Sequence, residues 1–154
     1  MTIEDDIAFL ERVPLLRRLG GGALRSLAIA AEPQTVRAGE VLFTAGQPAD
    51  GAFIVQDGSF TLKPERPGEA VIIAEPGILL GETSLLAETK RPATATARED
   101  STVLRLSRAT FLKILDSYPD AAQRLREMVA SRTNQWAREM ESIRAALARD
   151  KRPQ

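Results

Sequence analysis

Short apolar runs alternate with glycine and proline turns in the middle of the chain, and this pattern restricts the fold most strongly. Between residues 33 and 106, runs of β-favouring residues are interrupted by turn formers about every ten residues. The turns are Ala38-Gly39, Gly46-Gln47-Pro48, Asp57-Gly58, Pro67-Gly68 and Pro76-Gly77. Asp57-Gly58, set between two apolar runs, is the strongest local signal for a β-hairpin. Short strands at this spacing predict a small antiparallel barrel or roll and not a parallel sheet.

Helical patterns precede the β region. Ile3, Ile7 and Leu10 recur at helical spacing, and Pro14 breaks that pattern. The glycines at 20–22 are expected to end this helical lead-in. A second short helix is then expected to end near residue 33.

Helical patterns also follow the β region. A short helical patch is expected over residues 84–88, within the β region itself. Ser107 suits the N-cap of a helix, and Pro119 suits the first turn of a last, long helix. We therefore predict one α+β domain, mainly β, over residues 1–154. Its expected parts are a helical lead (2–32), an antiparallel, jelly-roll-like β-roll (33–106) and C-terminal helices (107–150).

A narrow seam runs along the last predicted helix. Its members are spaced alternately four and three residues apart: Val129, Thr133, Trp136, Met140, Ile143 and Leu147. Such a seam is typical of a helix that pairs with another helix, so we expect a homodimer through it. Trp136 is interpreted first as a packing or dimer contact, and second as a cap over a bound base.

Two missing residue types exclude most chemistry. The chain has no Cys and no His, which removes disulfides, Cys/His metal sites and His-based nucleophilic catalysis. No pair of acids stands in a recognisable catalytic pattern, so we predict neither an enzyme nor a metal or cofactor site. The 21 basic and 21 acidic side chains balance, which disfavours a dedicated nucleic-acid binder. No membrane-spanning run or signal peptide is visible, and we expect a cytoplasmic protein.

Residues 80–97 combine three features suited to a phosphate-bearing ligand. Gly81-Glu82 stands at the start of a short helical patch, where backbone N–H groups favour anions. The Glu82 carboxylate is an acceptor suited to a ribose hydroxyl. Arg91 offers a bidentate fork for phosphate oxygens. Together they describe a site for a ligand with one phosphate and a free hydroxyl.

The stretch Gly81-Glu82-Thr83-Ser84-Leu85-Leu86, followed by Arg91-Pro92-Ala93-Thr94, resembles the phosphate-binding cassette of the cyclic nucleotide-binding domain family. Members of this family serve as effector domains in the catabolite activator protein and in the regulatory subunit of protein kinase A. The resemblance extends over roughly residues 10–115 and implies an eight-stranded β-roll with a hinged C-terminal helix. It suggests a stand-alone bacterial-type member without a DNA-binding domain, because only one helix remains after residue 120 where a helix-turn-helix needs two.

The resemblance also implies roles for individual residues. Glu82 would accept the ribose 2′-hydroxyl, and Arg91 would pair with the cyclic phosphate. Backbone N–H groups around Gly81 and Ser84 would complete the phosphate cradle. The remaining candidates are the ligand-binding residues Thr83, Pro92, Ala93 and Thr94, and the base-pocket residues Leu79, Leu80 and Trp136.

Pro92 departs from the family pattern, which has Ala, Ser or Thr at this position. That residue contributes its N–H to the phosphate in the family, and a hydroxyl there helps to hold guanine. Proline has no N–H, and one lost donor costs about 0.5–1.5 kcal/mol. The hypothesis is weaker binding with cyclic AMP favoured over cyclic GMP.

Two functions are compatible with these residues. The first is a regulatory module that binds cyclic AMP, or cyclic GMP, and signals to an unknown downstream protein through its C-terminal helix. The second is a degenerate, ligand-independent dimerisation or scaffold module on the same fold, supported by Pro92 and the long seam. Direct DNA binding is not expected.

Overall fold

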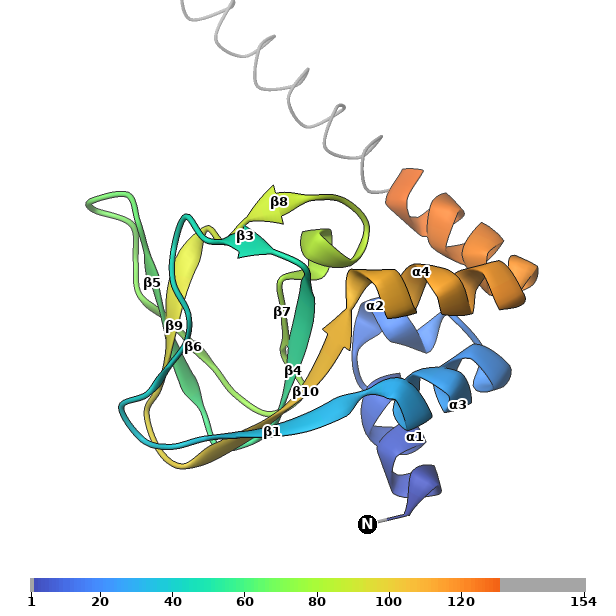
Figure 1. Cartoon of the computed structure of the whole chain (residues 1–154), viewed down its shortest axis with the longest axis horizontal. Helices are drawn as coiled ribbons and strands as arrows, with labels where there is room; N and C mark the ends of the chain where they lie inside the picture. Colours follow the sequence, from blue (N-terminus) through green and yellow to red (C-terminus); the bar gives the residue numbers. More distant parts are fainter. Residues whose placement is uncertain (1, 131–154) are drawn as a thin grey trace, which may run out of the picture.

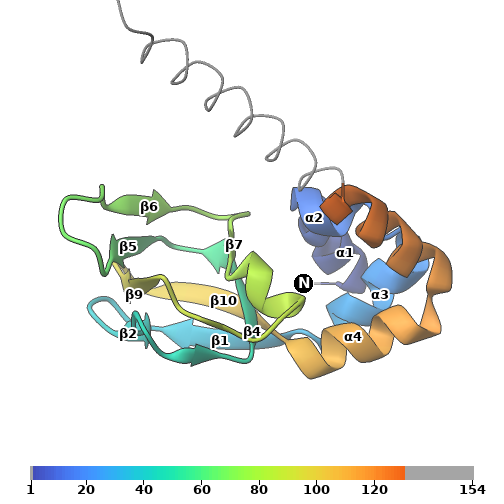
Figure 2. The same cartoon turned by 90° about the horizontal axis from the view of Figure 1, so that it is seen from above.

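The computed structural model describes residues 2–130 of the chain. A β-roll forms one end of the molecule, and helices from both ends of the described sequence gather at the other end (Figures 1 and 2). The predicted α+β fold with an antiparallel β-roll is confirmed. No separate DNA-binding domain lies within residues 2–130.

Three helices make up the N-terminal lead: α1 (Ile3–Glu11), α2 (Pro14–Arg17) and α3 (Gly21–Ala30). A capping box starts α1, since the Thr2 hydroxyl accepts from the Asp5 N–H and the Asp5 carboxylate accepts from the Thr2 N–H. The hydrogen bond from the Thr2 N–H to the Asp5 carboxylate is the main cause that lowers the pKa of Asp5.

The preceding helix α2 ends before the glycines at 20–22, as expected, but Gly21 and Gly22 already belong to the next helix, α3. Packing of Leu24 and Leu27 in the core outweighs the poor helix propensity of glycine. A Cβ at Gly22 would stand 2.8 Å from the Tyr118 ring, so the glycine also leaves room for that side chain.

Within residues 2–130, ten strands form two four-stranded sheets and a two-stranded ribbon, all antiparallel in their pairings. The first sheet has the order β1-β10-β4-β7, the second β2-β9-β5-β6, and β3 pairs with β8 in the ribbon. The strands are β1 (Glu32–Val36), β2 (Val41–Phe43), β3 (Pro48–Ala49), β4 (Gly51–Asp57), β5 (Phe60–Pro64), β6 (Ile72–Ala74), β7 (Leu79–Leu80), β8 (Thr89–Lys90), β9 (Ala93–Ala97) and β10 (Ser101–Ser107).

The prediction of a hairpin at Asp57-Gly58 is wrong, although the turn itself is present. The turn joins β4 and β5, which belong to different sheets and do not pair with each other. Gly58 has a φ of +83°, and a Cβ there would stand 2.8 Å from the Ser101 Cα. The Ser101 hydroxyl in turn accepts from the Ser59 N–H at 3.1 Å. The turn is therefore a corner at which the chain crosses from one sheet to the other.

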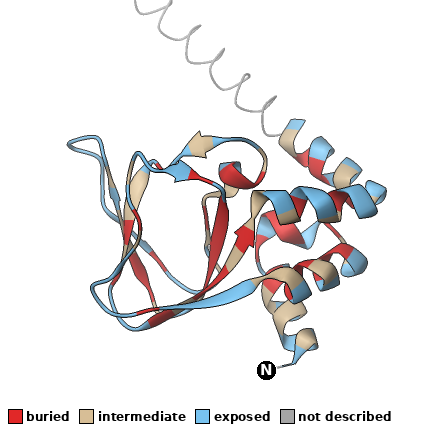
Figure 3. Cartoon of the chain, in the orientation of Figure 1, coloured by how far each residue is buried: buried red, intermediate tan, exposed pale blue. Residues whose placement is uncertain are grey.

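The β1-β10-β4-β7 sheet separates two apolar cores, as the buried segments in Figure 3 indicate. Alternate residues of β4 face opposite ways, with Phe53 and Val55 in the core of the roll and Ala52 and Ile54 in the core formed with the helices. Because both faces of this strand are covered, its apolar residues form a continuous run in the sequence.

Two helical segments follow the roll. Helix α4 (Arg108–Ser117) begins at the predicted N-cap, where the Ser107 hydroxyl accepts from the Thr110 N–H. Residues 119–130 are helical as far as the described part extends. None of the helices in residues 2–130 has the length and apolar character needed to cross a membrane. The seam residues Trp136, Met140, Ile143 and Leu147 lie outside the described residues, and Val129 packs against the helical core.

Candidate functional site

The cassette begins where β7 ends. Gly81 follows with a φ of +84°, and the short 3₁₀ helix η1 (Glu82–Leu85) starts directly after it. The expected helical patch over residues 84–88 therefore lies too late, since the helix starts two residues earlier than expected. The Ser84 N–H donates to the Gly81 carbonyl at 2.9 Å. This donor of the expected phosphate cradle is thus used inside the turn.

Arg91 lies between β8 and β9 with its backbone fixed on both sides. Its N–H donates to the Gln47 carbonyl, and its carbonyl accepts from the Gly46 N–H, each at 2.8 Å. The guanidinium carbon lies 4.4 Å from the centre of the Phe43 ring and 5.5 Å from that of Phe53. The two rings stack with their centres 6.0 Å apart. Arg91 therefore rests on an aromatic platform supplied by β2 and β4.

The Arg91 guanidinium is buried and incompletely satisfied. Arg91 is only 5% exposed, and its Nη1 has no hydrogen-bond partner within residues 2–130. Burial lowers the pKa of Arg91, while the nearby Asp50 carboxylate acts to raise it and Arg105 acts to lower it. Asp50 itself is paired with Arg105 at 2.8 Å. An anion that reached Arg91 would supply the acceptor that Nη1 lacks.

The Arg91 guanidinium approaches the backbone at Gly81. A Cβ at Gly81 would collide with the Arg91 Nη1, so the glycine allows the guanidinium to approach the backbone. Glu82 is the next residue and is half-buried. The phosphate-pairing and hydroxyl-accepting candidates thus lie on adjoining parts of one small region.

The other cassette residues are placed around this pair. The Ser84 hydroxyl is buried and lies 2.8 Å from the Thr89 hydroxyl, which ties η1 to β8. Thr83 and Pro92 are exposed. Ala93 and Thr94 begin β9, where the Thr94 hydroxyl accepts from the Ala45 N–H at 2.9 Å.

The base-pocket candidates Leu79 and Leu80 lie on opposite faces of the β1-β10-β4-β7 sheet. Leu80 belongs to the core of the roll, together with Phe43 and Phe53. Leu79 packs instead against the core formed with the helices. Trp136 lies outside the described residues. Of these candidates, Leu80 is the one that shares a core with the Arg91 platform.

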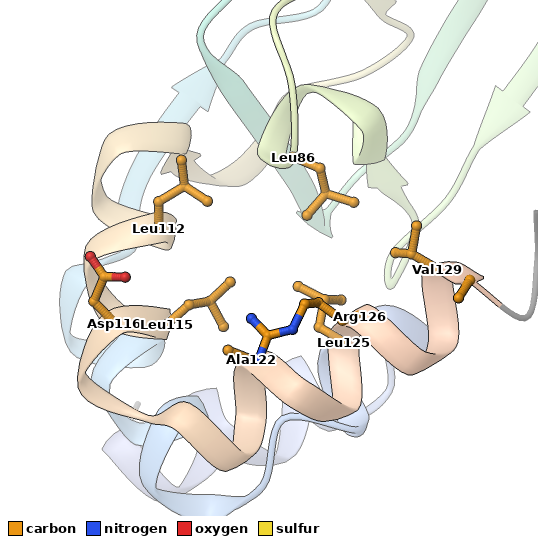
Figure 4. A pocket seen from close by; sticks show the side chains of 9 residues that line it. Leu86, Leu112, Leu115, Asp116, Ala122, Leu125, Arg126 and Val129 are labelled. Carbon is orange, nitrogen blue, oxygen red and sulfur yellow. The ribbon is translucent and has the colours of Figure 1, made fainter.

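A large apolar groove lies elsewhere, between the cassette and the C-terminal helices (Figure 4). Its volume is about 660 Å³, and Leu86 of the cassette faces α4 and the last helix across it. The groove is lined by Leu86, Leu112, Leu115, Asp116, Ala122, Leu125, Arg126, Val129 and Ala130. Arg91 is not among these residues, so the groove is distinct from the anion-binding candidate.

Reasoning from the sequence missed the residues that support Arg91. Phe43 and Phe53 occur in ordinary apolar runs, and nothing in those runs shows that the two rings meet under an arginine. Nothing in the sequence around Asp50 indicates that its carboxylate lies near Arg91. Its closeness to Arg91 depends on the β3–β8 ribbon, which pairs Pro48 with Lys90.

Comparison with known proteins agrees with this geometry. The family model for the cyclic nucleotide-binding domain matches residues 33–118, more than half of the chain. A cyclic nucleotide-gated potassium channel of Mesorhizobium japonicum is 32% identical over 120 residues, which cover 78% of this chain and 33% of the channel. The chain therefore spans about a third of the length of that relative.

Solved structures give the same result. A cyclic nucleotide-binding-like protein from Brucella abortus is 40% identical with a TM-score of 0.65, covering 73% of this chain and 98% of that one. The N-terminal domain of a transcriptional regulator from Streptomyces coelicolor is 28% identical with a TM-score of 0.78, covering 86% of this chain and 94% of that one. The chain belongs to the cyclic nucleotide-binding domain family.

Proposed function

We propose that this chain is a regulatory module in which Arg91 pairs with the phosphate of a cyclic nucleotide. The observation that carries the proposal is the buried Arg91 Nη1, which has no hydrogen-bond partner within residues 2–130. A buried cationic donor without an acceptor is costly. A phosphate oxygen offers both the acceptor and the opposite charge.

The neighbouring residues support a nucleotide over a simple anion. Glu82 directly follows Gly81, which lies close to the guanidinium, and this neighbourhood supports the proposal that its carboxylate accepts the ribose 2′-hydroxyl. Leu80 offers an apolar contact on the same side as the aromatic platform. We propose cyclic AMP as the preferred ligand, because Pro92 supplies neither an N–H nor a hydroxyl to hold guanine.

The signal is proposed to leave through the C-terminal helices of a single domain. The groove beside Leu86 supports this route, because the cassette, α4 and the last helix all border it. We further propose a cytoplasmic, non-enzymatic protein that acts on a downstream protein and dimerises through the seam from Val129 to Leu147. Trp136→Glu or Ile143→Glu should then give monomers in a sizing experiment, and an unchanged oligomeric state would remove the dimer from the proposal.

Two observations favour the second candidate, a scaffold that needs no ligand. Pro92 lacks an N–H, and the Ser84 N–H is already bonded to the Gly81 carbonyl. Both reduce the number of backbone donors available to a phosphate.

Thermal unfolding separates the two candidates. The wild-type protein and Arg91→Ala are each heated alone, with cyclic AMP, with cyclic GMP, and with adenosine as a phosphate-free control. At a hundred times its dissociation constant, a bound nucleotide should add about 2.7 kcal/mol of stability. We expect this gain for wild type with cyclic AMP and none for Arg91→Ala. If neither nucleotide shifts the wild-type transition, the scaffold is favoured.

A further inference from the structure

Arg108, the first residue of α4, connects that helix to the cassette. Its Nη1 donates to the carbonyl oxygens of Ala49 at 3.0 Å, Ser84 at 3.2 Å and Ala87 at 3.1 Å. Its backbone N–H donates to the Asp50 carbonyl at 2.7 Å. Arg108 thus links the start of α4 both to the segment before β4 and to the turn after η1.

Two of the three carbonyls that Arg108 binds, those of Ser84 and Ala87, lie at the C-terminal end of η1 or just beyond it. Ser84 lies near the end of this short helix, and Ala87 lies just beyond it, where outward-facing carbonyl oxygens collect partial negative charge. A guanidinium there makes charge-assisted hydrogen bonds, which are stronger than neutral ones. Arg108 is also partly buried, which reduces competition from water. Arg108 therefore connects the end of η1 directly to the start of α4.

Beside this link, apolar side chains of the cassette, α4 and the last helix line one shared groove. Leu86 precedes Ala87 in the chain and faces Leu112 and Leu115 of α4 across the groove (Figure 4). Leu125 and Val129 of the last helix line the same space. A volume of about 660 Å³ leaves room for these side chains to repack when the cassette shifts.

We infer that Arg108 is a positioning residue that transmits the position of the cassette to α4 and the helix after it. The inference rests on the proposed function, because it describes how a nucleotide bound at Arg91 is read by the C-terminal helices. Arg108 does not touch the ligand in this scheme. It couples η1, which moves with the ligand, to the helices that carry the signal.

Hydrogen exchange on the full chain, read by mass spectrometry, tests the coupling first without nucleotide. In Arg108→Ala we expect exchange to speed up at least about fivefold both in residues 82–87 and in residues 119–130. The Leu86 and Ala87 amides are good reporters, because both donate to the Thr83 carbonyl. Faster exchange in the cassette alone, or in neither segment, would overturn the inference. If Arg108→Ala does not fold, Arg108→Lys replaces it, with smaller changes expected in the same two segments.

Arg124 provides the matched control. It also binds two carbonyls, those of Arg18 at 2.8 Å and Leu19 at 2.9 Å, but it ties the last helix to the N-terminal lead. Arg124→Ala should speed exchange in residues 119–130 and leave residues 82–87 at the wild-type rate. Equal acceleration of the cassette in this variant would show that any loosened helix affects it, and Arg108 would have no special role.

The second half of the experiment adds saturating cyclic AMP. In wild type, protection should change in both the cassette and residues 119–130; in Arg108→Ala it should change in the cassette only. A full response of residues 119–130 in Arg108→Ala would refute the inference. If wild type shows no change with nucleotide, the proposed function fails, while the comparison without nucleotide still decides the role of Arg108.

Discussion

Replacing Arg91 with methionine should separate the role of this residue in binding from its role in stability. Methionine keeps an unbranched, apolar side chain on the Phe43 and Phe53 rings but removes the charge and all five donors. The structure predicts opposite effects on the protein with and without nucleotide. The reason is that a group poised for an absent partner costs stability until the partner binds.

The magnitude follows from the contacts of the guanidinium. A buried donor without an acceptor costs about 1–3 kcal/mol. Contact with the faces of the aromatic rings offsets roughly 0.5–2 kcal/mol of this cost. Without nucleotide, the unfolding free energy of Arg91→Met should therefore lie between about 1 kcal/mol below and about 2.5 kcal/mol above that of wild type. With cyclic AMP at a hundred times its dissociation constant, wild type should gain about 2.7 kcal/mol, a shift of about 5–10 °C, and the variant nothing.

The assay is urea unfolding and thermal melting of both proteins with and without cyclic AMP. Arg37→Met, at an exposed arginine, is the matched control and should respond to nucleotide like wild type. If Arg91→Met is destabilised by more than about 1 kcal/mol without nucleotide, the Nη1 group is already satisfied in the free protein. The reasoning from the buried, unpartnered donor would then be refuted.

Three further substitutions test other parts of the account. Gly81→Ala should cost about 1 kcal/mol or more of unfolding free energy and weaken cyclic AMP binding, because its Cβ collides with the Arg91 Nη1 and its φ is +84°; normal affinity by calorimetry would contradict this contact. Pro92→Ala should bind cyclic AMP up to about tenfold more tightly in the same assay, since it restores one N–H donor, and an unchanged dissociation constant would show that this N–H does not face the ligand. Gly58→Ala should lower stability by about 2 kcal/mol or more because its Cβ would press on the Ser101 backbone, with nucleotide affinity retained; a wild-type urea midpoint would contradict the close packing at this corner.

The course of the fold could be predicted from local turn chemistry, but the pairing of its strands could not. The glycine and proline turns located the strands because they act within a few residues. Asp57-Gly58 marks a turn correctly, yet the flanking strands belong to different sheets, and Gly58 packs against Ser101, more than forty residues away. The same limit applies to Gly22, because the Tyr118 ring for which it leaves room lies far away in the sequence.

The candidate site was predictable where it is contiguous in sequence. The motif from Gly81 to Thr94 assigned Gly81, Glu82 and Arg91 to one candidate site, and the structure brings the Arg91 guanidinium close to Gly81. It could not reveal the Phe43 and Phe53 platform, because that depends on strands from two different sheets meeting inside the roll. Nor could the motif reveal that the Ser84 N–H donates to the Gly81 carbonyl within the turn.

The link through Arg108 was likewise invisible, because the three carbonyls it binds carry no side-chain signature in the sequence. Only the folded backbone brings them around one guanidinium.

The central claim is that the buried Arg91 guanidinium receives the phosphate of a cyclic nucleotide. Titration calorimetry of cyclic AMP into the full chain tests it most directly, with Arg91→Met titrated in parallel. We expect wild type to bind one cyclic AMP per chain saturably, and Arg91→Met to show no measurable binding. Equal binding to both proteins, or no heat of binding to folded wild type at millimolar nucleotide, would contradict it.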